Sequence, residues 1–204
     1  LGMRGSDISA LSRQAHAALG VSGSLGTMIG VVSSSLHGSI VEPVLEEGMI
    51  LLMDGGCNVH NYASDISRTF VFGQHSAKQE EVWNLEKASQ AAGFAAAQLG
   101  APQENVDIAS RKVIVDAGYG PGYKTPGLPH RTGHGIGLDM HEWGNAVLGN
   151  KRPLAPGMCF SIEPTVAIPG EFGVRLEDCC YMTESGPNWF SNPSVAIDDP
   201  FGDN

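Results

Sequence analysis

Two segments of this sequence have the pattern of a β-hairpin with an acidic side chain on each arm. In the first, LLMDGGCNVHNYASDISRTFVFG (Leu51 to Gly73), strand-forming residues flank a polar centre. A turn centred between Val59 and His60 places Asp54 opposite Asp65. Opposed residues of an antiparallel pair have Cβ atoms about 4.5–5.5 Å apart, and like charges there are destabilising. We therefore expect a positive group between these two side chains.

The second hairpin repeats this arrangement near the C-terminal end of the sequence. In GMCFSIEPTVAIPGEFGVRLEDCCYMT, the residues Pro169, Gly170 and Glu171 supply turn chemistry between two apolar runs. A turn centred on Gly170 places Glu163 opposite Glu177. Both hairpins begin with Gly-Met six residues before their first acid, which supports an internal duplication. Two opposed acidic pairs in one chain predict a site for cations.

Composition limits the class of fold and the class of partner. The 204 residues, 42% of them hydrophobic, are enough for one large domain with a substantial core. The net charge of −10, with 12 Lys and Arg residues scattered along the chain, argues against a nucleic-acid partner. No apolar run approaches the roughly 20 residues of a membrane span, so we expect no membrane partner.

The cysteines indicate the cellular compartment of the protein, and the first residue indicates whether the sequence is a fragment. Cys57, Cys159, Cys179 and Cys180 lie in or beside predicted strands without CxxC spacing. We interpret them as small buried hydrophobes in a reducing compartment, in preference to zinc ligands or disulfides, and expect a cytoplasmic protein. The sequence begins at Leu1 with no initiator Met, which we interpret as the start of a fragment.

Hydrophobic periodicity and turn residues predict an α+β chain with two helices between the two hairpins. The long segment that follows the second of these helices is rich in Gly and Pro and is expected to be a loop. We expect the acidic pairs to converge on one sheet. The predicted elements are helices at 7–19, 77–99 and 106–117, the last with Asn105 as its N-cap, a strand at 28–34 and a loop at 118–145.

The Gly-rich and Pro-rich loop contains three histidines within twelve residues, His130, His134 and His141. A single histidine is more often structural than a ligand, but three histidines beside two acidic pairs favour a functional site. Glycines on both sides of His134 allow close approach of the backbone. Their G-x-G-x-G pattern follows a Pro-rich stretch and is not a dinucleotide fingerprint. The sequence also has no G-x-S-x-G, HExxH or GxxxxGK[ST] motif.

Four carboxylates and one imidazole form the candidate ligand set. The set is richer in oxygen than a typical structural zinc site, and four carboxylates exceed what one divalent ion usually takes. Two ions that share bridging carboxylates would account for both acidic pairs. Manganese fits best, with cobalt, iron or zinc as alternatives. Two metals polarise a carbonyl and generate hydroxide near neutral pH, so hydrolysis is the expected chemistry.

Four motifs, in this order, carry a resemblance to a known family: DGG...YASDISRTF, HRTGHGIGLDMHE, FSIEPT and GVRLEDC. They resemble the catalytic domain of the pita-bread metallopeptidases (family M24), most closely the Xaa-Pro dipeptidases (prolidases) and Xaa-Pro aminopeptidases. The similarity covers nearly the whole chain from about His37 onward. It implies a curved antiparallel sheet flanked by helices with pseudo-twofold symmetry. It also implies that residues 1–204 are a fragment of the catalytic domain, without the family's N-terminal domain and the start of the first helix.

The resemblance implies which residues hold the two metals. Asp54 resembles the terminal aspartate that binds one metal, and Asp65 resembles the bridging aspartate. His134 and Glu163 resemble the ligands of the other metal. Glu177 resembles the bridging glutamate.

The resemblance also implies substrate and catalytic roles. His37 lies where the family has a histidine that lines the substrate pocket, and His130 and His141 match the pair that contacts substrate or intermediate. Glu163 would pass a proton to the leaving prolyl nitrogen after a metal-bridged hydroxide attacks the Xaa-Pro carbonyl. His130 or His141 would stabilise the oxyanion. Arg175 resembles a second-layer cation that holds the metal carboxylates.

The backbone conformation of Thr165 and the role of Trp143 are open at this point. This chain has Glu163-Pro164-Thr165 where the family more often has Glu-Pro-Gly, and a glycine there could adopt φ values that Thr165 resists. Trp143 either walls the proline pocket or only packs against neighbours.

The function implied by the resemblance is that of a hydrolase. It would cut Xaa-Pro bonds in small peptides with two divalent metal ions, as a proline dipeptidase or an Xaa-Pro aminopeptidase, and the full-length protein would be a homodimer. Three alternatives stay open. These are a methionine aminopeptidase, a non-peptidase amidohydrolase of the same fold that acts on a small cyclic or guanidino compound, and a non-catalytic scaffold. The motif flanks and the short second hairpin favour the proline-specific branch, and the presence of all five ligand types opposes the scaffold.

Overall fold

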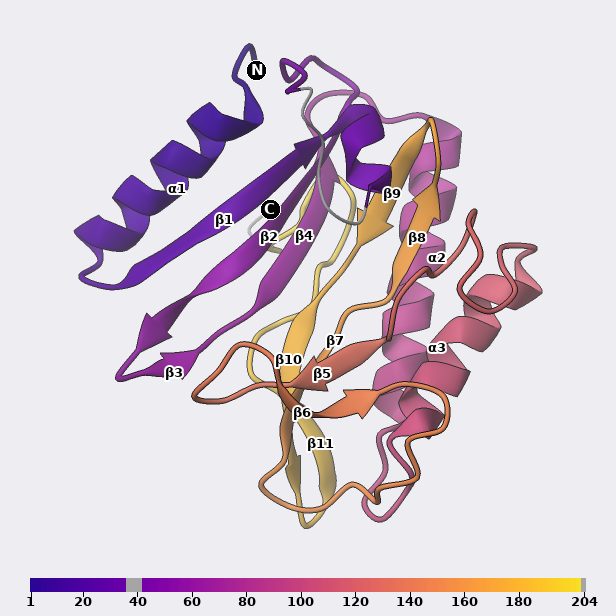
Figure 1. Cartoon of the computed structure of the whole chain (residues 1–204). Coiled ribbons are helices and arrows are strands. Elements are labelled where there is room, and N and C mark those ends of the chain that lie inside the picture. The colour runs from indigo at the N-terminus through magenta and orange to yellow at the C-terminus, as the bar shows by residue number, and fades with distance from the viewer. Residues whose placement is uncertain (36–41, 203–204) are drawn as a thin grey trace.

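The N-terminal third of the chain forms an antiparallel sheet with one helix along it (Figure 1). The computed structural model describes residues 1–35 and 42–202. Strand β2 lies between β1 and β4, and the short strand β3 pairs with the far end of β2. Helix α1 lies beside β1. The elements are α1 (Gly5–Ala18), β1 (Ser22–Ile29), β2 (Ile50–Val59), β3 (Tyr62–Ala63) and β4 (Ile66–Val71).

The strand predicted at 28–34 is wrong over most of its length. Strand β1 ends at Ile29, and a 3₁₀ helix, Gly30–Ser34, follows. The φ of Gly30 is 57°, a left-handed conformation that glycine adopts without steric cost and that turns the chain out of the sheet. The β-branched Val31 and Val32 that follow gave the segment its strand-like composition.

The first hairpin differs in register from the prediction. Its turn lies at His60 and Asn61, whose φ values of 51° and 69° are those of a two-residue type I′ turn. Asp54 therefore pairs with Ser67, and the predicted pairing of Asp54 with Asp65 is wrong. The predicted centre of the turn was one residue too early. The residue predicted to lie opposite Asp54 therefore differs from the observed one by two positions. A shift of two keeps both aspartates on one face of the sheet.

The second hairpin has the predicted register. Thr165 pairs with Arg175 on one side of the acidic pair, and Ile162 pairs with Asp178 on the other. Glu163 and Glu177 occupy the equivalent positions between these ladders and so face each other. The strands of this half include β7 (Cys159–Ile162), β8 (Thr165–Ile168), β9 (Phe172–Arg175), β10 (Asp178–Thr183) and β11 (Gly186–Trp189).

Two short strands lie in the segment that was predicted to be a loop. Strands β5 (Gly133–Gly135) and β6 (Glu142–Ala146) pair with each other, and β5 also pairs with β7. They complete a five-stranded sheet in the order β11-β10-β7-β5-β6. A Cβ atom on Gly133 would lie 1.9 Å from Ser161 O, so glycine is needed for this close approach of strands.

Helices α2 (Ala77–Ala96) and α3 (Glu104–Asp116) confirm the two helices predicted between the hairpins. They lie against each other and against the side of the sheets away from α1 (Figure 1). Trp83 of α2 is 1% exposed, and its indole N–H donates to Thr69 O of β4 at 2.8 Å. The N-cap of α3 is Gln103 and not the predicted Asn105. None of the helices within 1–35 and 42–202 is long and apolar enough to span a membrane.

Candidate metal centre

His134 of β5 lies at the centre of a group of carboxylates. Its Nε2 atom is 3.3 Å from Glu163 Oε1, 3.7 Å from Asp65 Oδ2 and 4.0 Å from Glu177 Oε1. The side chains of His134, Asp65 and Glu177 are each less than 10% exposed. The fold thus brings four of the five predicted ligands together from strand ends that are far apart in the sequence.

Asp54 completes the predicted set from β2. Ligand atoms of Asp54, Asp65 and Glu177 lie within 4.8 Å of one another, and so do those of His134, Glu163 and Glu177. Glu177 belongs to both groups, so the geometry offers two neighbouring cation positions with at least one shared carboxylate. The metal-binding role of these five residues stays a prediction.

The donor set of this cluster fits divalent cations. Carboxylate oxygens with one imidazole suit Mn²⁺ and similar ions better than a soft, sulfur-binding metal. Glu177 Oε1 is buried and forms no hydrogen bond within the described part of the chain. A buried oxygen without a hydrogen bond is unusual, and a cation is the partner that the surrounding ligand atoms indicate.

Burial raises the pKa of the clustered carboxyls. The pKa of Asp65 is raised to about 6, first by burial and then by the charge of Asp54. Burial raises the pKa of Glu163 to about 7, against the opposing charge of Arg175. Burial also raises the pKa of Glu177 well above its ordinary value. Positive charge bound between these groups would favour their ionised forms and lower these values.

His134 presents an unprotonated nitrogen to the carboxylates. Its Nδ1 lies 3.0 Å from Gly135 O, and since a carbonyl oxygen only accepts, Nδ1 carries the hydrogen. Burial lowers the pKa of His134 to about 4, so the ring is neutral at pH 7. The Nε2 lone pair therefore faces three carboxylates, an arrangement that a cation between them would make favourable.

Ser67 and Arg175 support the carboxylates from the second layer of contacts. The Ser67 hydroxyl oxygen lies 2.6 Å from Asp54 Oδ1 and 2.7 Å from Glu177 Oε2, and it accepts a hydrogen bond from Arg175 Nε at 3.0 Å. Arg175 also forms an ion pair with Asp54. Arg175 thus lies where the sequence placed it, beside the acidic cluster.

His130 lies near the cluster with both ring nitrogens engaged. Its Nδ1 donates to Arg131 O at 2.6 Å, so Nε2 accepts from the Thr165 hydroxyl at 2.9 Å. Thr165 begins strand β8, and its φ is not among the positive values found in the described residues. Thr165 therefore fits this backbone without strain and adds a partner for His130 that a glycine would lack.

His141 packs edge-on against His134, with ring centroids 4.3 Å apart, and is itself exposed. Asp65, His134 and His141 form a third group of possible ligand atoms within 4.8 Å. The predicted substrate residue His37 lies outside the described residues. Trp143 is 93% exposed, so the packing interpretation of this side chain is wrong.

Two further residues near the cluster were not singled out from the sequence. Ser67 lies two positions after Asp65 on the same strand face, which is the signal that could have identified it. Arg131 donates to Asn145 Oδ1 at 2.9 Å. Its charge adds to the lowering of the His134 pKa by burial and opposes the raising of the Glu163 pKa by burial. Its position directly after His130 in the sequence was the available signal.

Comparison with known proteins gives one family and a consistent set of relatives. The profile of metallopeptidase family M24 matches residues 2–184. An Xaa-Pro dipeptidase of Lactobacillus delbrueckii subsp. lactis is 41% identical over 148 residues, which are 72% of this chain and 39% of that protein. The Xaa-Pro dipeptidase of Lactobacillus helveticus is 43% identical over 143 residues, or 70% of this chain and 38% of that protein.

Solved structures agree with this assignment. The Xaa-Pro dipeptidase from Bacillus anthracis matches with a TM-score of 0.88 at 32% identity, covering 96% of this chain and 55% of that chain. A dipeptidase from Pyrococcus horikoshii OT3 matches with a TM-score of 0.88 at 29% identity, covering 97% and 55%. The chain therefore spans about two fifths of the length of these curated relatives and about half of these solved chains.

Proposed function

The chain belongs to metallopeptidase family M24 and has its pita-bread fold, and we propose that it hydrolyses peptide bonds that precede proline. The family implies divalent metal ions. The observation that supports the proposal best is the buried cluster in which His134 Nε2 faces three carboxylates within 4.0 Å. The names of the relatives, Xaa-Pro dipeptidases, supply the proposed class of substrate.

The proposed ligands divide into two sets with shared members. Asp54 would bind one ion, His134 and Glu163 would bind the other, and Asp65 and Glu177 would bridge them. The shared place of Glu177 in two ligand groups supports this division. Manganese suits the oxygen-rich donor set best. Two bound ions would polarise the scissile carbonyl and supply hydroxide near neutral pH.

Glu163 is the residue best suited to move the proton. Its side chain is 12% exposed, more than those of Asp65 and Glu177, so its carboxylate is the one of these three that a bound peptide can best reach. The Glu163 backbone N–H donates to Thr132 O at 2.7 Å, which fixes the base of the side chain. Glu163 would therefore deliver a proton to the leaving prolyl nitrogen.

His141 is the better of the two predicted oxyanion donors. It is exposed beside His134, so its ring can reach a substrate oxygen. His130 already accepts from Thr165 at Nε2 and donates to a carbonyl at Nδ1. Both ring nitrogens of His130 are therefore occupied, and His130 would contact substrate mainly through van der Waals contacts of its ring.

The proposal includes the cellular location, the partners and the oligomeric state of the full-length protein. All four cysteines are free, and Cys179 and Cys180 are buried, which supports a reducing, cytoplasmic location. The net charge of −10 supports small peptides, in preference to nucleic acid, as partners. A homodimer follows from the resemblance to the family alone.

Metal content and hydrolysis, measured together, test this proposal. Elemental analysis of the full-length protein is followed by assays with Mn²⁺ of proline release from an Xaa-Pro dipeptide and of Xaa release from an Xaa-Pro tripeptide. About two metals per chain with cleavage of either peptide is the expected result. Glu163→Gln should bind peptide with little hydrolysis, and Glu171→Gln, an exposed acid of the same hairpin, is the matched control. Metal without cleavage of either peptide contradicts the proposed substrate, and absence of metal contradicts the site.

A further inference from the structure

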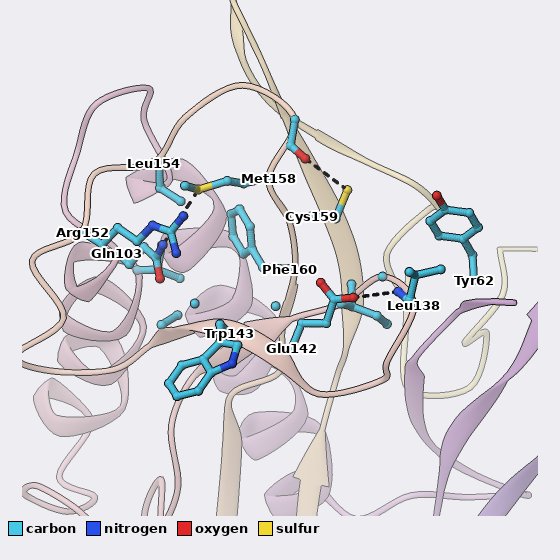
Figure 2. A pocket seen from close by; sticks show the side chains of 17 residues that line it. Tyr62, Gln103, Leu138, Glu142, Trp143, Arg152, Leu154, Met158, Cys159 and Phe160 are labelled. Carbon is cyan, nitrogen blue, oxygen red and sulfur yellow. Dashed lines mark hydrogen bonds between the residues drawn. The ribbon is translucent and has the colours of Figure 1, made fainter.

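A cavity of about 390 Å³ is lined by residues of strands β5, β6 and β7 and of helix α3 (Figure 2). Gly135 pairs with both Glu142 and Phe160, so these three residues form one row across the strands and face the same side of the sheet. His134 and His141 alternate with this row and point to the opposite side. The cavity therefore lies on the other side of the sheet from these two histidines, although it shares Cys159 and three other lining residues with a second pocket that includes Asp65.

The cavity lining is polar and apolar in about equal parts, and its apolar part comes from the helix-covered side of this sheet. Three of the wall residues, Ala146, Leu154 and Phe160, are 3–5% exposed and belong to the core cluster under α2 and α3. Pockets for small organic ligands commonly have volumes of about 300–1,000 Å³, and the volume of this cavity falls in that range. The apolar wall residues are Val106, Ala146, Leu154, Met158 and Phe160.

Arg152 supplies a positive charge at the rim of the cavity. Its backbone is fixed, because its N–H donates to Asn150 Oδ1 at 3.1 Å and its carbonyl accepts from Gln103 N at 3.0 Å. Its guanidinium group forms no hydrogen bond or ion pair with any residue that the structure describes. In a chain of net charge −10, such a guanidinium at the rim of a cavity is available to a carboxylate on a ligand.

Glu142 supplies the opposite charge across the cavity. Its Oε1 accepts the backbone N–H groups of Leu138 at 2.7 Å and Asp139 at 3.3 Å, which holds the carboxylate in place. Its Oε2 accepts no hydrogen bond from the described residues. Figure 2 shows Glu142 and Arg152 on either side of the Phe160 ring. The lining thus offers a carboxylate that is held in place and a guanidinium without a partner among the described residues, one on either side of the Phe160 ring.

We propose that this cavity binds a free apolar L-amino acid. Its carboxylate would lie at Arg152, its ammonium group at Glu142, and its side chain against Phe160 and Met158. A molecule with one charge of each sign and an apolar body matches all three parts of the lining, whereas a purely apolar ligand would form no charge-assisted hydrogen bond with Arg152 or Glu142. The significance of the site rests on the proposed function, since hydrolysis of an Xaa-Pro dipeptide releases a product of this class.

Methionine signals locate the ligand without any need for catalysis. The metal-free chain, labelled with ¹³C at its methionine methyl groups, is titrated with leucine by NMR. Leucine is expected to shift the Met158 signal with saturation at about millimolar concentration and to leave Met53 of β2 unchanged. Leucinamide lacks the carboxylate and 4-methylpentanoate lacks the ammonium group, so each should bind about tenfold more weakly.

Two variants separate the proposed contact from a general effect of charge. Arg152→Met should weaken leucine binding about tenfold and leave leucinamide binding unchanged. Arg13→Met removes an exposed arginine of α1 that has no side-chain partner among the described residues, and it should bind leucine as the unmodified chain does. An unmoved Met158 signal, a shift of Met140 in its place, or equal effects of the two variants would overturn the proposal.

The same leucine titration on a longer protein that contains this chain tests whether another segment of that protein occupies the cavity. A leucine-dependent shift of Met158 there supports an open amino-acid site. Loss of the shift in the longer protein would show that another segment fills the cavity, which overturns the proposal. Because these titrations contain no metal, a failure of the proposed peptidase activity would leave their outcome unaffected.

Discussion

Ser67 and Glu177 are joined by three hydrogen bonds that connect the two hairpins. The Ser67 N–H donates to Glu177 O at 3.3 Å, and the Glu177 N–H donates to Ser67 O at 3.1 Å. The Ser67 hydroxyl lies 2.7 Å from Glu177 Oε2 and leaves Oε1 directed toward His134. The carboxylate that both proposed metal positions share is therefore placed by a hydroxyl that is not itself a ligand.

Ser67→Ala should weaken Mn²⁺ binding to the metal-free chain about tenfold, because groups that hold metal ligands typically affect affinity by 10–100-fold. Isothermal titration calorimetry measures this effect independently of activity. Ser67→Thr keeps the hydroxyl and should restore most of the affinity. Ser89→Ala removes an equally buried hydroxyl that donates to Ser110 O in the helix layer, and it should bind Mn²⁺ normally. Unchanged affinity in Ser67→Ala contradicts the positioning role.

Asp65→Asn should remove dinuclear metal binding and stabilise the metal-free chain. The folded chain raises the pKa of Asp65 from 3.8 to about 6. Ionisation therefore favours the unfolded chain as the pH rises through this window, and the folded state loses stability. Asparagine carries no charge, so its advantage in free energy of unfolding should reach about 3 kcal/mol at pH 7 and fall to about 0.5 kcal/mol at pH 4.

Denaturant unfolding in EDTA at pH 4 and pH 7 measures this difference for Asp65→Asn, and elemental analysis counts the metals. Asp139→Asn, at a site exposed to solvent, is the control and should show no such pH dependence. A variant that retained two metals per chain would refute the bridging role of Asp65.

Local turn chemistry explains why one register was predictable and the other was not. Pro169 and Gly170 mark the second turn in the sequence, and its register is as predicted. The first turn uses His60 and Asn61, a pair without glycine, in left-handed conformations. The acidic cluster remained predictable because side chains alternate with a period of two, and the register error was also two.

Glu86→Gln should stabilise the chain above pH 4.5 by an amount that grows with pH. Both carboxylate oxygens of Glu86 are buried in α2 without a hydrogen bond from any described residue. Burial raises the pKa of Glu86 well above 4.5, an effect that the charge of Arg175 and the nearby Leu176 N–H, which does not reach hydrogen-bond geometry, only partly oppose. The stability that the protonated form gives is complete below pH 4.5 and is lost as the pH rises, by about 1.4 kcal/mol per pH unit of the shift.

Unfolding of Glu86→Gln and the unmodified chain between pH 4 and pH 8 measures the effect. Glu81→Gln changes an exposed acid of the same helix and should follow the unmodified chain throughout. A constant difference between Glu86→Gln and the unmodified chain across this range would show that Glu86 does not titrate as inferred.

Contacts between distant segments set the limit of what the sequence could predict. The resemblance to family M24 named all five clustered residues, yet Ser67 was passed over because its partner Glu177 lies 110 positions away. The glycines around His134 have the composition of a loop, while the structure uses them as strands in close contact. Local sequence patterns indicate secondary-structure propensity and the alternation of side chains along a strand. They do not indicate how closely two segments approach each other when these segments meet only in the folded chain.

Gly133→Ala should disrupt the placement of His134 by separating β5 from β7. The added Cβ would lie 1.9 Å from Ser161 O, a backbone atom that cannot move without breaking the sheet. We expect a loss of about 3 kcal/mol or more in free energy of unfolding, measured by denaturant titration, together with loss of Mn²⁺ binding. Gly26→Ala is the matched control, because its Cβ would meet nothing closer than Asp54 O at 3.4 Å. If Gly133→Ala were as stable as Gly26→Ala, the close approach of β5 and β7 would not be what holds His134 among the carboxylates.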